Sequence, residues 1–189
     1  MPIFGKKKPS QDSQVWHDYP DFLDVNDKDD VEWIKQSNDP LVWHTAALAC
    51  LIFRGDEHDL LTWLTQQPNL DRVTAASMFL HGGNGASFLL GRPLNYVQMP
   101  QEQLAKMLKC LCEQDATRTL VDSGIGLEPG WESARQDTIK ELADHPLAPL
   151  AMLSRPVDRQ TVTMPYSDIG EGDLASRKYL KEEMPFLFG

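Results

Sequence analysis

The 189-residue chain contains only three cysteines, Cys50, Cys110 and Cys112. Such a small, odd number without regular spacing does not make a disulfide framework and is typical of a reducing compartment. Cys110 and Cys112 lie two residues apart, so on a helix their side chains point in different directions. No second Cys or His pair stands at the spacing of zinc ligands, and we therefore predict neither a metal site nor a cofactor.

Basic residues are also scarce, because 18 Lys and Arg stand against 28 Asp and Glu, which gives a net charge of −10. Phosphate-rich surfaces attract Lys and Arg, so this balance argues against nonspecific binding to nucleic acid or to anionic membranes. The excess is local: residues 12–59 hold 12 of the acidic residues and only three basic ones, Lys28, Lys35 and Arg54.

Long apolar runs are absent. The longest, Leu41 to Phe53, has 13 residues, whereas a membrane span needs about 20. Polar and acidic residues follow the basic cluster Lys6–Lys8, although a signal peptide would continue with about 7–15 apolar residues. We expect a cytoplasmic protein that does not insert into membranes.

The middle of the chain shows helical periodicity with clear start and stop signals. Asp39-Pro40 begins an apolar helix that Gly55 ends, and Pro68 and Asp71 separate the two helices that follow. Because the connections are short, neighbouring helices must pack against one another. The sequence predicts an all-α fold, a single helical bundle or short helical array of about five to seven helices.

The chain divides into three predicted regions. Residues 1–15 form a flexible basic N-terminus, residues 16–150 the helical domain, and residues 151–189 an extended C-terminal tail. Within the domain, residues 82–100 are expected to be irregular, and residues 160–164 could make one short strand.

No established catalytic motif is present. The glycine-rich stretch His81 to Gly85 follows a helix and lacks a subsequent Lys, so it predicts a helix end rather than a phosphate loop. The five histidines are scattered. An unrecognised enzyme site near His44 and His81 remains an alternative, because the fold could bring these two side chains together.

An acidic segment with interleaved aromatic residues precedes the first predicted helix. One interpretation is a solvated segment that caps this helix, and the other is a docking surface for a basic partner, in which aromatic residues serve as interface anchors. The residues predicted to bind a partner are Trp16, Tyr19, Asp21, Phe22, Asp24, Asp27, Asp29, Asp30 and Glu32.

Residues 63–79 contain the pattern P-x-x-D-x-x-T-A-x-x-x-F, met by Pro68, Asp71, Thr74, Ala75 and Phe79. In this pattern the segment resembles a bacterial family of uncharacterised helical domains. The pattern is architectural, since Pro68 ends one helix and Asp71 caps the next. The resemblance implies a bacterial protein without an enzyme signature, in the style of small proteins encoded beside polymorphic or type VI secretion toxins.

These features favour a non-catalytic binding protein, a bacterial immunity protein that neutralises a cognate toxin through an acidic surface. Toxins that act on nucleic acids are commonly basic, so an acidic inhibitor is steered toward them. The alternatives are a structural or adaptor protein of a secretion or envelope assembly, which would use the C-terminal residues 184–188, and the enzyme considered above.

Overall fold

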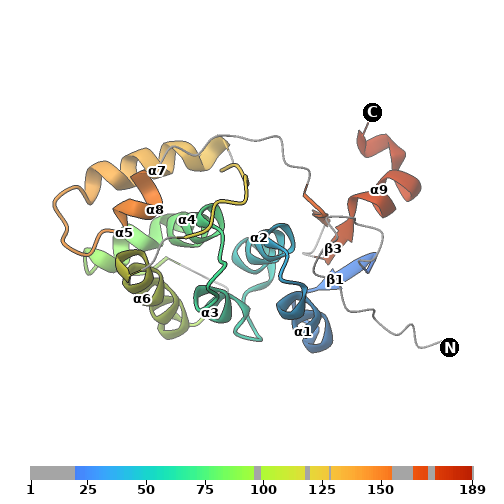
Figure 1. Cartoon of the computed structure of the whole chain (residues 1–189), viewed down its shortest axis with the longest axis horizontal. Helices are drawn as coiled ribbons and strands as arrows, with labels where there is room; N and C mark the ends of the chain where they lie inside the picture. The colour runs from blue at the N-terminus through green and yellow to red at the C-terminus, as the bar shows by residue number, and fades with distance from the viewer. Residues whose placement is uncertain are drawn as a thin grey trace.

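A computed structural model of the chain describes residues 20–95, 99–117, 120–127, 129–154, 164–169 and 173–188. Helices predominate within these residues, and they are accompanied by one small sheet (Figure 1). The predicted all-α class is confirmed, with the sheet as a minor addition. The predicted basic N-terminus, residues 1–15, lies outside the described residues.

The elements have the following bounds. The helices are α1 (Lys28–Ser37), α2 (Pro40–Ala49) with its π-helical continuation η2 (Cys50–Arg54), α3 (Leu60–Thr65), α4 (Arg72–Leu80), the 3-10 turn η3 (His81–Gly83), α5 (Asn84–Leu89), α6 (Gln101–Thr117), α7 (Pro129–Glu141), α8 (Leu150–Ser154), α9 (Arg177–Glu183) and the 3-10 helix η4 (Pro185–Phe188). The strands are β1 (Phe22–Asp24), β2 (Tyr166–Ile169) and β3 (Asp173–Ser176).

Helix α4 lies at the centre of the helical part, and all nine of its residues are buried. It contacts α2, α5, α6, α7 and α8. The Asp71 carboxylate caps its N-terminus by accepting the backbone N–H of Val73 at 2.7 Å, as the sequence pattern predicts for this helix start. Ala75 and Phe79 are fully buried in the same core.

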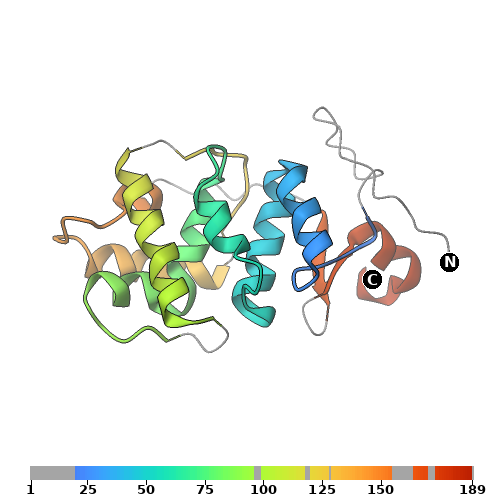
Figure 2. The ribbon, with the colours of Figure 1, turned by 90° about the horizontal axis from the view of Figure 1, so that it is seen from below.

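Helix α2 is the second buried element. Asp39 caps it, Pro40 occupies its first turn, and the helix continues through η2 until Gly55, whose φ of 78° ends it. Trp43 is buried, donates its indole N–H to the Ile34 carbonyl at 2.9 Å, and meets the Trp63 ring edge-on at 5.4 Å. Figure 2 shows α6, α3, α2 and α1 side by side, with the sheet and α9 beyond them.

The C-terminal segment is not the extended tail that the sequence predicts. Strand β3 pairs antiparallel with β2 and with β1, in the order β1-β3-β2. The Tyr166 hydroxyl also donates to the Pro20 carbonyl at 2.6 Å, so β2 is joined to the segment before β1. The described residues between 166 and 188 therefore hold two strands and two helices. Of the possible strand 160–164, only Met164 is described, and it lies outside β2.

The sequence does not predict the sheet, because its strands have three or four residues each. A run of that length is too short to display a period of two. Strand β1 also pairs with β3, a segment far along the chain. Pairing between β1 and β3 links a segment of the predicted domain, residues 16–150, to one of the predicted tail.

Part of the segment predicted to be irregular, residues 82–100, forms helix α5. The Asn84 side chain fixes it, since its Oδ1 accepts the backbone N–H of Asn95 at 2.8 Å. Gly85 then passes directly against Phe79: a Cβ built on Gly85 would lie 2.4 Å from the Phe79 ring. Only a residue without a side chain allows α5 to lie this close to α4.

We predict that Gly85→Ala destabilises the protein by about 2 kcal/mol, because an overpacked core must displace the buried Phe79 ring. The measurement is urea unfolding followed by circular dichroism. Gly130→Ala is the control, since Gly130 is also helical and nothing lies within 4 Å of a Cβ built there. Equal stability of the two variants would contradict the contact.

Candidate functional site

The acidic segment folds into strand β1, a turn and the start of α1. Three of its carboxylates bond to the chain's own backbone. Asp27 caps α1 by accepting the N–H groups of Asp29 and Asp30 at 2.8 and 3.0 Å. Asp24 accepts from Asn26 at 2.8 Å, and Asp30 accepts from Asp24 at 3.0 Å. These contacts match the capping interpretation of the segment.

The remaining acidic residues of the segment face solvent. Asp21, Asp29 and Glu32 are exposed, and Glu32 forms an ion pair with Lys35 at 3.0 Å. Trp16 and Tyr19, which are predicted to anchor the same surface, lie outside the described residues. Phe22 is 44% exposed and packs edge-on against Tyr179 of α9, with ring centroids 4.4 Å apart.

A second acidic loop lies next to this segment. The sequence does not reveal that the two are close together. The His58 side chain donates from Nε2 to the Asn26 carbonyl at 2.9 Å, so the loop before α3 contacts the turn before α1. Glu57 and Asp59 of this loop are exposed. The structure thus joins two groups of carboxylates that are about 30 residues apart in the chain.

The loop before α3 is fixed by a side chain of α6. Gln103 Nε2 donates to the Asp56 carbonyl at 2.9 Å and to Asp59 Oδ1 at 2.8 Å. The Asp56 carboxylate is buried and accepts the N–H groups of Leu60 and Leu61 at 2.6 and 3.0 Å. Burial raises the pKa of Asp56 to about 6, although these two N–H groups oppose the rise.

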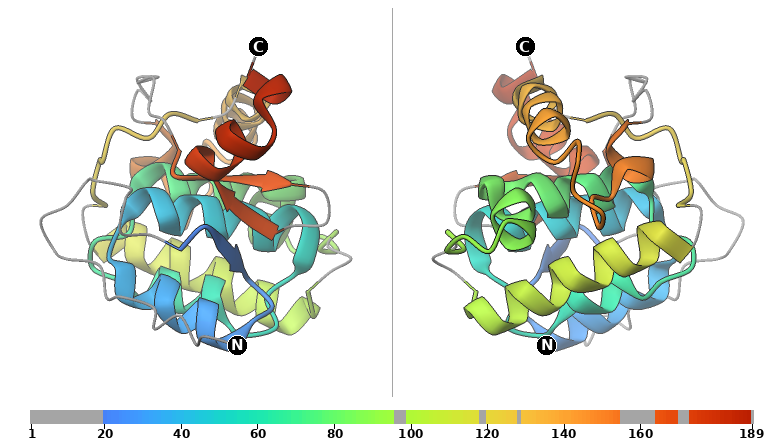
Figure 3. Two further views of the ribbon diagram at one scale, coloured as in Figure 1. Left: turned by 90° about the vertical axis from the view of Figure 1, so that its right-hand side faces the viewer. Right: turned by 90° about the vertical axis from the view of Figure 1, so that its left-hand side faces the viewer.

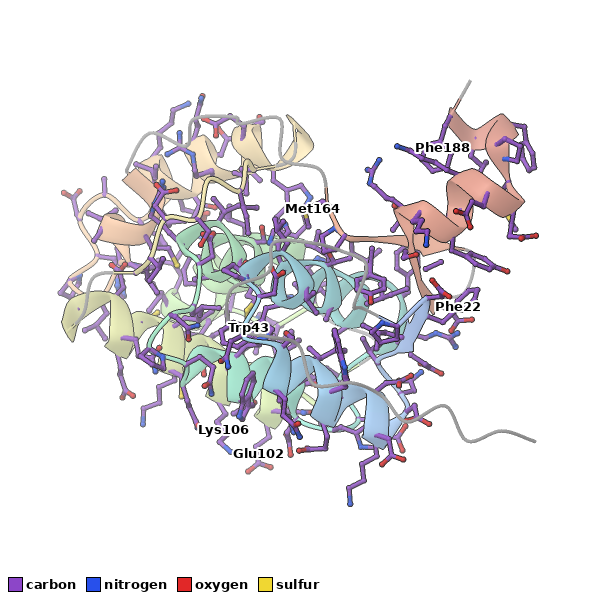
Figure 4. All side chains as sticks on the ribbon, turned by 45° about the vertical axis from the view of Figure 1, so that its right-hand side comes forward. Phe22, Trp43, Glu102, Lys106, Met164 and Phe188 are labelled. Atoms are coloured by element: carbon purple, nitrogen blue, oxygen red, sulfur yellow. The ribbon has the colours of Figure 1, made fainter. Side chains whose placement is uncertain are left out.

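A cleft of about 640 Å³ opens between this loop and α6. Figure 4 shows Glu102 and Lys106, two of its lining residues, pointing outward from α6. Four carboxylates and two cations are among the lining groups, so the cleft is polar and carries an excess of negative charge. The lining residues are Arg54, Asp56, Glu57, Asp59, Pro100, Glu102, Gln103 and Lys106.

We call the exposed carboxylates of both segments and of the α6 start the acidic surface. It comprises Asp21, Asp27, Asp29, Glu32, Glu57, Asp59 and Glu102. Of the nine residues predicted to bind a partner, four belong to it, while Asp24 and Asp30 are partly buried and hydrogen-bonded within the chain. Sequence reasoning missed Glu57, Asp59 and Glu102, because only the fold brings their segments together.

The two histidines considered for catalysis have different partners. His44 is buried and its Nδ1 lies 2.9 Å from Thr74 Oγ1, whereas the His81 ring lies 5.8 Å from the Trp131 ring. Burial lowers the pKa of His44 to about 4 and also lowers the pKa of His81. His44 is therefore a neutral core residue that bonds α2 to α4.

Two of the three thiols lie in surroundings that suppress ionisation. Cys50 is fully buried, and burial raises its pKa. Burial, with Asp115 and Glu113 nearby, raises the pKa of Cys112 to about 12. Since the thiolate is the reactive form, neither thiol has the electropositive setting of a nucleophile.

Within the described parts of the chain, no group of three or more His, Cys, Asp or Glu side chains is arranged to hold a metal ion. None of the helices found there has both the length and the apolar composition that crossing a membrane requires.

The chain was compared with known proteins. It matches no family model, no curated protein and no solved structure. Of the pattern P-x-x-D-x-x-T-A-x-x-x-F, the residues Asp71, Thr74, Ala75 and Phe79 are buried in the core, whereas Pro68 is exposed.

We predict that His44 makes the protein less stable in acid. As the pH falls from about 6.5 to 4, His44 becomes protonated in the unfolded state but stays neutral in the folded state, where it is buried. The free energy of unfolding therefore falls by about 3 kcal/mol because of this residue. His44→Gln removes the titration and keeps a polar group beside Thr74. The measurement is urea unfolding of both proteins at pH 7.5 and pH 4.

The quantity that tests this prediction is the free energy of unfolding of the wild type minus that of His44→Gln. We expect this difference to fall by about 3 kcal/mol from pH 7.5 to pH 4. A difference that is the same at both pH values would show that His44 is protonated in the folded protein.

Proposed function

We propose that the chain is a non-catalytic binding protein, a cytoplasmic bacterial immunity protein that neutralises a cognate toxin through the acidic surface. The observation that carries the proposal is the contact between His58 and the Asn26 carbonyl, which places two acidic segments side by side and adds the cleft at α6 to them. A continuous acidic surface is suited to a basic partner.

Charge also favours a protein over nucleic acid as the partner. The phosphate backbone would be repelled by the carboxylates that dominate this surface. A basic toxin, such as one that itself binds nucleic acid, presents the opposite sign and would be drawn to it from a distance. The cleft would then accept a basic side chain near Glu57, Asp59 and Glu102.

The hydrogen bonds that fix the two acidic loops support a non-catalytic binding role for this surface. Asp27, Asp56 and Gln103 fix the two loops through backbone hydrogen bonds, so the exposed carboxylates are presented in a defined arrangement before binding. Preorganised groups lose less conformational freedom on association, which favours affinity.

The direct test uses the protein encoded by the neighbouring gene. Purified full-length chain should bind that protein with a Kd below 1 μM, on the order expected for a specific complex, and co-expression should relieve its toxicity. Calorimetry and a growth assay measure the two effects. Absence of binding at micromolar concentrations, with both proteins folded, would sink the proposal.

Neutralising the acidic surface should slow association. We expect Asp29→Asn, Glu57→Gln and Glu102→Gln together to lower the association rate about tenfold at low salt and to weaken its salt dependence, because steering depends on the charges that face the partner at the docking surface. None of these three side chains caps a helix, so the fold should be retained. Stopped-flow fluorescence at several salt concentrations is the measurement.

The matched control removes three exposed carboxylates elsewhere, by Glu113→Gln, Asp137→Asn and Asp144→Asn. This variant has the same net charge as the first and should associate at the wild-type rate within about twofold. Equal slowing by both variants would assign the effect to net charge alone and reject the acidic surface as the docking site.

A role as an adaptor protein is the second candidate, favoured by the exposure of Phe186 and Leu187 at the C-terminal end. The catalytic alternative is tested by His44→Ala and His81→Ala. If both variants fold and still neutralise the toxin, these histidines do not serve a reaction.

A further inference from the structure

The C-terminal end of the described chain exposes a group of large apolar side chains. Phe186 is 78% exposed and Leu187 is 52% exposed, although both belong to an ordered 3-10 helix. We call the group the C-terminal apolar patch. It consists of Met184, Phe186, Leu187 and Phe188, and Phe22 is a further exposed aromatic residue beside Tyr179 near the start of α9. Aromatic side chains bury on the order of 150–250 Å² each, so the patch is large for a single segment.

The patch stands on a defined support. Ser176 caps α9 by accepting the Tyr179 N–H at 3.1 Å, and Leu180 is buried beneath the helix. The edge-on contact of Phe22 with Tyr179 then fixes α9 against β1. Figures 1 and 3 show α9 projecting from the helical body, and Figure 4 shows Phe22 and Phe188 at this same end.

The charges around the patch differ from those of the acidic surface. Helix α9 carries three basic residues, Arg177, Lys178 and Lys181, followed by two acidic residues, Glu182 and Glu183. Lys181 Nζ lies 5.8 Å from the centre of the Phe188 ring, so a cation borders the patch. A basic partner would meet these cations and would not be attracted here.

The order of these charges is self-complementary. When two α9 helices pack antiparallel about a twofold axis, the basic first part of one faces the acidic last part of the other. Because η4 follows the C-terminal end of α9, the apolar side chains of each η4 then lie near Phe22 and the start of α9 in the other copy. A second copy of the same chain is the partner that satisfies both the charge pattern and the apolar contact.

We propose that the C-terminal apolar patch is a homodimer interface, which pairs β1, α9 and η4 of two copies about a twofold axis. Because the interface is confined to one short strand, one helix and one 3-10 helix, the dimer belongs to the small class of interfaces and its Kd is micromolar. The residues of the acidic surface lie outside these three elements, so dimerisation does not depend on the proposed function.

The test is the mass of the full-length wild-type chain measured by sedimentation equilibrium between about 5 and 500 μM, a range that brackets a micromolar Kd. We expect a monomer–dimer equilibrium. The double variant Phe186→Ser with Leu187→Ser should weaken dimerisation at least tenfold, since each copy loses two large apolar contacts with the other. Leu147→Ser is the control, because Leu147 is 64% exposed in the connection between α7 and α8.

Three results would overturn the proposal. The first is a monomeric wild type throughout the concentration range, and the second is dimerisation that survives the double substitution. The third is a wild-type chain that is monomeric, together with a double variant that binds the neighbouring gene's protein more weakly than the wild type does. That result would assign the patch to this partner. Unfolding in urea checks that both variants fold like the wild type, and since Phe186 and Leu187 are exposed, no loss of stability is expected.

Discussion

The complete burial of α4 is the constraint on which the rest of the structure depends. A helix without a solvent-facing side must be covered all round, and α2, α5, α6, α7 and α8 provide that cover. Its N-terminus is enclosed as well, so its first backbone N–H groups need partners inside the protein. Asp71 supplies one acceptor, and its second carboxylate oxygen accepts the Ser123 N–H at 2.7 Å.

The same helix start explains the position of the segment after α6. Arg72 donates its N–H to the Val121 carbonyl, and Val121 donates to Leu70, so this segment runs beside the residues that enter α4. The buried Arg72 guanidinium then meets the Asp122 carboxylate at 2.6 Å. Burial raises the pKa of Asp71, while the N–H groups that it accepts keep this rise in check. One polar cluster therefore fixes a loop that has no regular structure.

Local signals in the sequence predict helices such as α2 and α4, whereas α5 and α9 lie in segments predicted to be irregular or extended. Asp39-Pro40 and Asp71 each begin a helix where a capping side chain is expected, and Gly55 and Gly82 end helices with positive φ. These features act within a few residues, so a single sequence reveals them. The pairing of β1 with β3 and the contact of His58 with Asn26 depend on segments far apart in the chain. No local pattern encodes such pairings, which is why Glu57, Asp59 and Glu102 were not predicted as part of the acidic surface.

The sign of the charge along the surface separates two kinds of contact. Around the acidic surface the carboxylates outnumber the cations, and two copies of this surface would repel each other. At α9 the two signs are nearly balanced and follow one another along the helix, so a second copy is not repelled there. A net charge of −10 on the whole chain would by itself oppose self-association. Because the charge is unevenly distributed, the local repulsion between two copies is weak at the end of the molecule that carries α9. Phe186 and Leu187 face solvent at this same end.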